Sequence, residues 1–156
     1  MTNSSTQLIH SIFEQAHLRS AVLPYAGAVT PAEAFQLLEA DPAILLIDVR
    51  TDAERDWVGR VKINPAQMHA VQWNLYPTRS NPDFLAQLAE LARPETTLLF
   101  LCRSSARSRA AAQLATEHGY LHCYDILEGF EGDRDVSGHR KNLNGWCHAG
   151  LPWSGA

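Results

Sequence analysis

The 156-residue sequence has few cysteines, no long apolar run and no excess of basic residues. Its three cysteines are an odd number without close spacing, which indicates thiol chemistry in a reducing compartment rather than a disulfide framework. Residues 1–7 lack the basic start and apolar core of a signal peptide, and the apolar runs 43–47 and 98–102 are too short to span a bilayer. We therefore expect a cytoplasmic protein without a membrane partner.

The charge balance also excludes a class of partners. The formal net charge is -4 and charged residues make up 19% of the chain, with both signs interspersed. A nucleic-acid-binding domain would carry a basic footprint, so we expect no nucleic-acid partner. Recognition of an anion, if it occurs, must depend on a local group of residues.

Short apolar runs alternate with helical patterns along most of the chain. Buried strands are predicted at 43–49, 97–101 and 121–127 because these runs are unbroken and short. Capping boxes that begin at Thr30 and Thr51 open two of the intervening helices. Strands that alternate with helices predict one α/β domain with a mostly parallel sheet, and 46% apolar residues are enough for its core.

The two ends of the chain have different patterns. Residues 7–19 place apolar side chains at helical spacing, so we expect a leading helix that packs outside the main fold. After Glu128 the chain is rich in glycine, which predicts loops. Phe130, Trp146 and Trp153 are expected to anchor these loops on the domain.

Cys102 is the strongest candidate for a reactive residue. It follows the buried strand at 97–101 and comes just before a helix whose first N–H groups and positive dipole end favour a thiolate over a thiol. Ligands of α/β folds bind at the carboxyl ends of strands. No acidic residue lies between Glu95 and Glu117, whereas three arginines do: Arg103, Arg107 and Arg109.

If residues 102–107 curl with their N–H groups inward, they form a small anion-binding nest around the sulfur. Such a nest could hold a persulfide anion or a sulfur oxyanion. The alternative is that Cys102 fills space at a strand end, because free cysteines are among the most buried residues. The coincidence of the arginines with the strand-to-helix position favours the nest.

The motif Cys-Arg-Ser-x-x-Arg-Ser at residues 102–108 resembles the active-site loop of single-domain rhodaneses. Residues 46–50 with Glu54 are similar to the Asp-Val-Arg segment of that family, and residues 127–130 and 145–152 are similar to its ending. The resemblance covers about residues 26–153. It implies a rhodanese-like three-layer α/β domain over 26–156 with a mostly parallel central sheet, preceded by an extra helical extension over 1–25.

The resemblance also implies roles for single residues. Cys102 would be the sulfur acceptor, and Asp48 and Arg50 would line or brace the pocket. No metal and no organic cofactor is implied. The transferred group would lie in a cradle formed by the backbone of Arg103, Ser104, Ser105, Ala106 and Arg107.

The expected reaction is transfer of a sulfane sulfur. The Cys102 thiolate would attack the outer sulfur of a small anionic donor, thiosulfate or a persulfide, and cyanide or a thiol would then remove the sulfur from the resulting persulfide. A protein could also accept it. Two alternatives are a small phosphatase or arsenate reductase on the same fold and a non-catalytic rhodanese-like binding module. The related phosphatases have a loop longer by one residue, which favours sulfur here.

One residue and one short segment depart from the family pattern. Ser105 stands where many relatives have glycine, which suits a left-handed backbone better. Residues 62–66 replace the usual Pro-Gly turn, which suggests a pocket rim shaped for a different substrate.

Several other residues have structural or chemical interpretations. Arg50 and Glu54 could pair across one helical turn. Cys123 is expected in the core, and Cys147 could act as a resolving thiol, although nothing in the sequence places it near Cys102. The His122-Cys123 and Cys147-His148 pairs lack the spacing of a known zinc clip.

Overall fold

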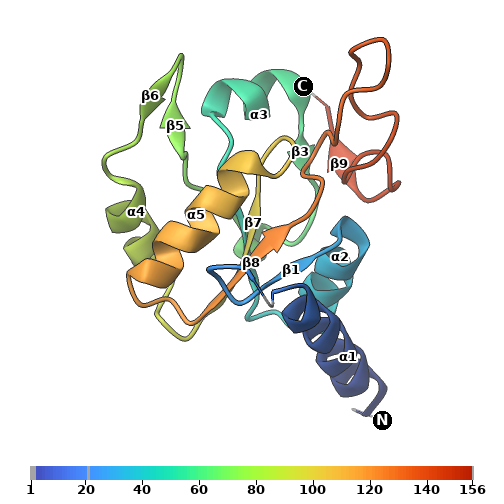
Figure 1. The fold of residues 1–156 in the computed structure, drawn as a ribbon, viewed down its shortest axis with the longest axis vertical. Helices are drawn as coiled ribbons and strands as arrows, with labels where there is room; N and C mark the ends of the chain where they lie inside the picture. Colours follow the sequence, from blue (N-terminus) through green and yellow to red (C-terminus); the bar gives the residue numbers. More distant parts are fainter. Residues whose placement is uncertain (1–2, 21, 156) are drawn as a thin grey trace.

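A five-stranded parallel sheet forms the centre of the molecule (Figure 1). The structure is a computed structural model that describes residues 3–20 and 22–155, without the side chains of residues 3 and 4. Across the sheet the strands are β1 (Gly27–Val29), β8 (His122–Ile126), β7 (Thr97–Leu101), β2 (Leu45–Asp48) and β4 (Met68–Ala70). The helices are α1 (Asn3–Arg19), α2 (Pro31–Ala40), α3 (Asp52–Val58), α4 (Phe84–Leu91) and α5 (Ala106–Glu117), with a 3₁₀ turn η1 at Pro65–Gln67.

Two short antiparallel strand pairs lie outside this sheet. One joins β3 (Arg60–Val61) to β9 (Trp153–Ser154), and the other joins β5 (Asn74–Leu75) to β6 (Arg79–Ser80). Both pairs lie with α3 at the upper end of the molecule in Figure 1. The predicted α/β class and the predicted parallel sheet are therefore confirmed.

The sheet has a core on each face because side chains alternate along every strand. Leu46 and Leu99 face α1 and α2, whereas Ile47 and Phe100 face α4 and α5. All four are fully buried. This alternation gives the three layers that the resemblance implied, and it decides on which face each polar residue of a strand emerges.

The leading helix is part of the fold rather than outside it, which corrects the expectation from the sequence. Ile12 and Ala16 of α1 are buried in the same core cluster as α2. Gly27 of β1 makes this close packing possible, because a Cβ there would lie 2.6 Å from the Ala16 carbonyl oxygen. An ion pair between Arg19 and Glu33 links α1 to α2.

The helix starts that were predicted from capping boxes are confirmed. The Thr30 hydroxyl accepts a hydrogen bond from the Glu33 amide, and the Thr51 hydroxyl accepts one from the Glu54 amide. The three predicted strands are confirmed too. Within the described residues, no helix has the length and apolar character needed to cross a membrane.

Candidate active site

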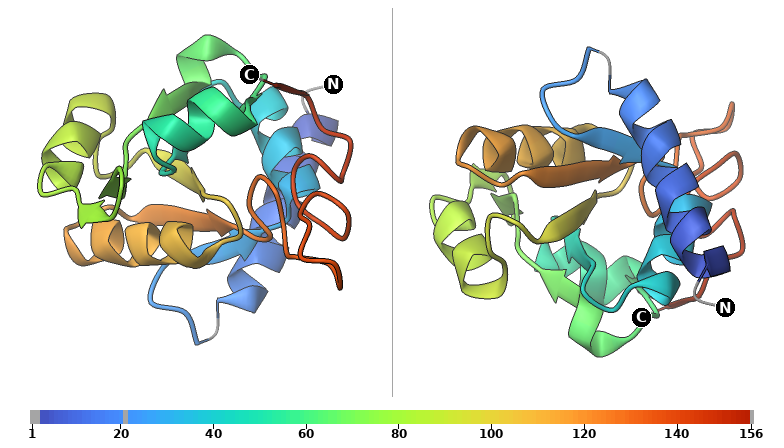
Figure 2. Two further views of the ribbon diagram at one scale, coloured as in Figure 1. Left: turned by 90° about the horizontal axis from the view of Figure 1, so that it is seen from above. Right: turned by 90° about the horizontal axis from the view of Figure 1, so that it is seen from below.

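The carboxyl end of β7 leads directly into the loop that contains Cys102. Ser104 of this loop is half-buried, and Ala106 lies exposed at the first position of α5. Viewed from above in Figure 2, α3 and the C-terminal loops lie around the region where β7 passes into α5. Segments far apart in the sequence therefore meet at this end of the sheet.

Cys102 lies at the base of the loop, with only 1% of its surface exposed. Its Sγ accepts a hydrogen bond from the Ser105 amide at 3.0 Å and contacts the Ser108 hydroxyl at 3.4 Å. The sulfur packs on the α4 and α5 face of the sheet, but the chain wraps it with polar groups. The thiol is therefore held in an environment that can stabilise negative charge on sulfur.

Ser105 adopts the left-handed conformation, with a φ of 93°. A side chain raises the energy of this conformation, which explains why glycine is common at this position of the loop. The Ser105 hydroxyl donates a hydrogen bond to Asp125 Oδ2. The departure from glycine thus comes with a buried carboxylate that holds the strained serine in place.

Asp125 and Ser108 are site residues that the sequence analysis missed. The Ser108 hydroxyl donates a hydrogen bond to Asp125 Oδ1, and both residues are fully buried. Burial raises the pKa of Asp125, although the hydrogen bonds from Ser105 and Ser108 oppose that rise. The available signal was a carboxylate within the apolar run 121–127, at the carboxyl end of a predicted strand.

Arg107 does not extend freely into the site. Its guanidinium donates to both carboxylate oxygens of Glu54 on α3, at 2.5 and 2.8 Å. Burial favours the protonated form of Glu54, but the hydrogen bonds and charge of Arg107 outweigh it and lower the pKa of Glu54 to about 2. The pairing of Arg50 with Glu54 that we expected is wrong, because Arg107 takes this carboxylate.

Asp48 and Arg50 are fully buried and bind each other. Arg50 also donates to the Gly59 carbonyl oxygen at 2.9 Å and stacks over the Phe130 ring, 4.2 Å from its centroid. Asp48 extends to the α1 and α2 face of the sheet, because Leu46, two residues before it, does so. These contacts fit bracing of the site and leave neither side chain in the cleft described below.

The C-terminal segment clamps the loop from the outside. The Phe130 amide donates to the Cys102 carbonyl oxygen at 2.8 Å, and the Glu131 amide donates to the Arg103 carbonyl oxygen at 3.0 Å. Gly129 passes so close that a Cβ there would lie 2.5 Å from the Arg103 carbonyl group. Phe130 and Trp146 are fully buried, which confirms that they anchor this segment. Trp153 is 37% exposed and meets the Phe130 ring edge to face, so the expectation that it is an anchor holds only in part.

A cleft of about 300 Å³ lies beside the loop, between Arg103 and Arg107 on one side and the β5–β6 hairpin on the other. The hairpin contributes Tyr76, whose side chain is exposed. Arg103 Nε is buried and has no hydrogen-bond partner among the described residues. Burial and the nearby charges of Arg103 and Arg134 lower the pKa of Arg140, which indicates a positive field on this side of the site.

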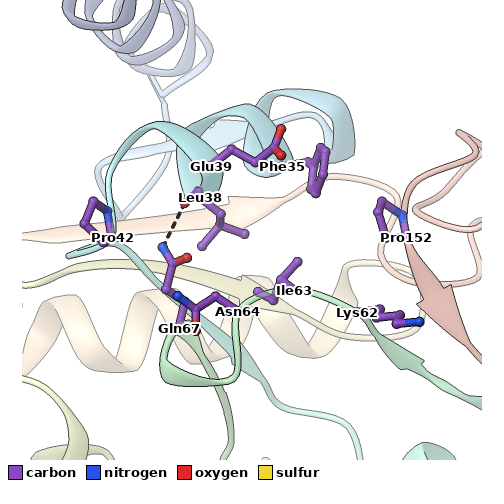
Figure 3. Close-up of a pocket in the computed structure, with 9 residues that line it drawn as sticks. All are labelled: Phe35, Leu38, Glu39, Pro42, Lys62, Ile63, Asn64, Gln67 and Pro152. Atoms are coloured by element: carbon purple, nitrogen blue, oxygen red, sulfur yellow. Dashed lines mark hydrogen bonds between the residues drawn. The ribbon is translucent and has the colours of Figure 1, made fainter. Parts of the chain in front are cut away.

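The larger groove of about 710 Å³ lies elsewhere, between α2 and the segment that joins β3 to η1 (Figure 3). Lys62, Ile63 and Asn64 line it, and none of its lining residues belongs to the cleft beside Cys102. The unusual segment 62–66 therefore does not form the rim of that cleft, contrary to what its sequence suggested. Glu39 and Lys62 are the charged residues that line this groove, and no cysteine, serine or threonine is among its lining residues.

The other two cysteines lack a comparable environment. Burial raises the pKa of Cys123 and that of Cys147 to about 11 each, so both remain thiols at neutral pH. Cys123 is fully buried, as expected, and Cys147 packs beside the core on the other face of the sheet from Cys102. In the part of the chain that the structure describes, no three His, Cys, Asp or Glu side chains gather as a metal site requires.

Comparison with known proteins places this geometry in a family. Residues 26–156 match the model of the STR4 middle domain. The crystal structure of Rv0390 from M. tuberculosis is similar, with a TM-score of 0.76, 38% identity, and coverage of 85% of this chain and 99% of that one.

Two curated relatives extend the comparison. The RP600 homolog of Rickettsia rickettsii is 32% identical over 128 residues, which cover 80% of this chain and 94% of that protein. The chloroplastic protein THYLAKOID RHODANESE-LIKE of Oryza sativa subsp. indica is 30% identical over 139 residues, which cover 88% of this chain but 27% of the rice protein. On this evidence the chain belongs to the single-domain rhodanese-like family.

Proposed function

We propose that the protein is a sulfurtransferase that carries sulfur as a persulfide on Cys102. The observation that carries this proposal is the hydrogen bond from the Ser105 amide to Cys102 Sγ at 3.0 Å, within a loop of four residues between Cys102 and Arg107. An amide held at this distance stabilises a thiolate, and it stabilises charge that spreads to a second sulfur bound on the first. The family membership supports the same reaction class.

The reaction has two steps. The Cys102 thiolate attacks the outer sulfur of thiosulfate, a bond forms between the two sulfur atoms, and the bond to the central sulfur of thiosulfate breaks as sulfite leaves with the electron pair. The terminal sulfur of the persulfide is then taken by cyanide, which becomes thiocyanate, or by a thiol. The thiolate of Cys102 returns, so the cycle requires no cofactor. A persulfide could replace thiosulfate as donor.

The two arginines of the loop have different charged neighbours and therefore different roles. Glu54 already neutralises Arg107, so the fixed positive charge left to attract an anionic donor comes mainly from Arg103. Arginine binds oxyanions through forked hydrogen bonds. Arg103 lines the cleft, and its buried Nε has no hydrogen-bond partner among the described residues. We infer that Arg103 binds the donor, whereas Arg107 fixes the loop to α3.

Two observations favour sulfur transfer over phosphate-ester or arsenate chemistry. The loop is shorter by one residue than that of the related phosphatases, so its ring is narrower. Cys102 is also only 1% exposed, so access to this residue is restricted. A donor that presents a terminal sulfur fits such access better than a tetrahedral oxyanion that must be enclosed by the loop.

The test is mass spectrometry of the intact protein after exposure to thiosulfate. The mass should increase by one sulfur atom, and cyanide should remove it. Cys102→Ser should abolish the adduct, whereas the matched variant Cys147→Ser should retain it because burial keeps Cys147 a thiol. An adduct that persists in Cys102→Ser, or hydrolysis of an aryl phosphate without any sulfur adduct, would overturn the proposal.

The proposal includes the cell compartment and the partners. Three unpaired cysteines suit the reducing cytosol. A small anionic sulfur donor and a thiol or cyanide acceptor complete the reaction, and a protein thiol could serve as acceptor. If thiosulfate leaves no adduct but a protein is bound in its place, the chain is a binding module.

A further inference from the structure

A continuous row of hydrogen bonds connects the reactive thiol to a buried carboxylate. The Cys102 thiol donates to the Ser108 hydroxyl at 3.4 Å, and that hydroxyl donates to Asp125 Oδ1. Asp125 Oδ2 accepts from the Ser105 hydroxyl, and the Ser105 amide returns to Cys102 Sγ. The network is thus a closed circuit in which Asp125 touches both residues that touch the sulfur.

The burial of this circuit limits its charge. Cys102 is 1% exposed and Asp125 and Ser108 are not exposed at all, so water screens the two acidic groups weakly. Two negative charges that are separated by a single serine hydroxyl repel strongly, and such a pair of groups releases its protons in two distinct steps. The favoured intermediate form of the pair therefore holds one negative charge and one proton.

Few other charges face Asp125. Arg109 on α5 lowers the pKa of Asp125, but the burial of the carboxyl group raises it and is the larger effect. Tyr25, from the segment before β1, is the other titratable group that interacts with Asp125, and burial together with the Asp125 charge raises the pKa of this tyrosine. Tyr25 thus stays neutral at physiological pH, and among the described residues Arg109 is the positively charged group that acts on the carboxyl group of Asp125.

We propose that Cys102 and Asp125 share one proton through Ser108, so that Asp125 takes up the proton that Cys102 gives up when it becomes the nucleophile. Asp125 does not contact the sulfur itself and is a positioning residue that acts through the two serines. This proposal deepens the proposed function, because it rests on Cys102 being the reactive thiol.

The proton movement is balanced. The S–H bond of Cys102 breaks as its proton moves to Ser108 Oγ, and the O–H bond of Ser108 breaks as its own proton moves to Asp125 Oδ1. The products are a thiolate, an intact serine hydroxyl that now donates to the sulfur, and a neutral carboxylic acid. The total charge of the circuit stays at minus one. When the persulfide anion later occupies the loop, the neutral Asp125 does not repel it.

The experiment is a pH titration of the thiolate ultraviolet absorbance in the full chain, with the curve of Cys102→Ser subtracted to remove every other thiol and tyrosine. The wild type should titrate in two separated steps. The lower step, which leaves a partial thiolate signal at neutral pH, should be lost in Asp125→Asn, which retains a single step to the full signal. The matched control Asp83→Asn changes an exposed carboxylate without a side-chain cap bond and should retain both steps.

Ser108→Ala tests the path and serves if Asp125→Asn does not fold. This variant keeps the Asp125 carboxylate but removes the hydroxyl through which the proton passes between Cys102 and Asp125. The lower step should therefore be lost or strongly reduced. A single step in the wild type, or a lower step that survives in either variant, would overturn the proposal. No sulfur donor is used in this titration. Its result is therefore separate from that of the mass measurement, which tests sulfur transfer alone.

Discussion

Glu54 and Arg107 lie 53 positions apart in the chain and form two hydrogen bonds that fasten the first turn of α5 to α3. Both side chains retain about one fifth of their exposure, so water screens this ion pair only in part. Glu54 also accepts a hydrogen bond from the Thr51 amide as part of the capping box. One carboxylate thus serves two local structures, the start of α3 and the position of the loop.

The first prediction concerns Glu54→Gln. The substitution keeps the shape but removes the charge, so unfolding at neutral pH should cost about 1–2 kcal/mol less than in the wild type after allowance for solvent screening. The folded-state pKa of Glu54 is about 2, below its ordinary 4.5. Its contribution is therefore complete above about pH 4.5 and is lost as the pH falls toward about 2.

Urea unfolding of both proteins along this pH range measures the difference. The gap between wild type and Glu54→Gln should close as the pH falls through that window. Glu39→Gln is the control, because Glu39 is exposed and shares no ion pair with another described residue. A gap that stays constant from neutral to acidic pH would mean that Glu54 stabilises the fold through its shape alone.

The second prediction compares two substitutions of Ser105. Ser105→Ala keeps a side chain in the left-handed conformation and removes the hydrogen bond to the buried Asp125, which should cost about 1–3 kcal/mol of stability. Ser105→Gly loses the same hydrogen bond but relieves the backbone strain, which is about 1 kcal/mol. Ser105→Gly should therefore be the more stable of the two in urea unfolding. The reverse order would show that strain at this position is negligible.

The sequence predicted much of the fold because local signals decide it. Capping boxes at Thr30 and Thr51 depend on residues three apart, and unbroken apolar runs need only a few neighbours to be recognised as buried strands. The placement of Cys102 after such a strand was likewise local. The resemblance to rhodaneses then supplied the three-layer arrangement, which local patterns alone could not give.

The contacts that determine the site were not predictable in the same way. The pairing of Glu54 with Arg107 spans distant segments, and a local rule assigned Glu54 to Arg50 instead. Asp125 meets Ser105 and Ser108 because β8 lies next to β7 in the sheet and the side chain at 125 emerges on the α5 face. Strand order and facing decide this contact, and neither is evident in the sequence around Cys102.

The third prediction concerns the clamp on the loop. Gly129→Ala should lower stability by roughly 2 kcal/mol more than Gly138→Ala and should reduce sulfur loading of Cys102. Both glycines have positive φ, so both variants bear the same kind of backbone strain, but a Cβ at 129 would lie 2.5 Å from the Arg103 carbonyl group, whereas one at 138 would meet nothing within 4 Å. Urea unfolding and the mass measurement test the pair. Equal effects of the two variants would show that the clamp yields without disturbing the loop.

The last prediction concerns Arg103. Glu54 engages Arg107, so Arg103 is the arginine of the cleft whose charge remains for a dianionic donor. Arg103→Gln should raise the KM for thiosulfate roughly 10-fold, the equivalent of about 1.4 kcal/mol, because one charge-assisted hydrogen bond is lost. The kcat should change much less, because the amide that faces the sulfur belongs to Ser105 and remains in place.

Ionic strength separates this binding role from a structural one. Added salt screens the attraction between Arg103 and the donor, so it should raise the KM of the wild type more steeply than that of Arg103→Gln. Arg60→Gln is the control, because Arg60 is exposed, pairs with Asp56 and lies outside the cleft. If Arg103→Gln lowers kcat and leaves the KM and its salt dependence unchanged, Arg103 shapes the loop and the donor binds elsewhere.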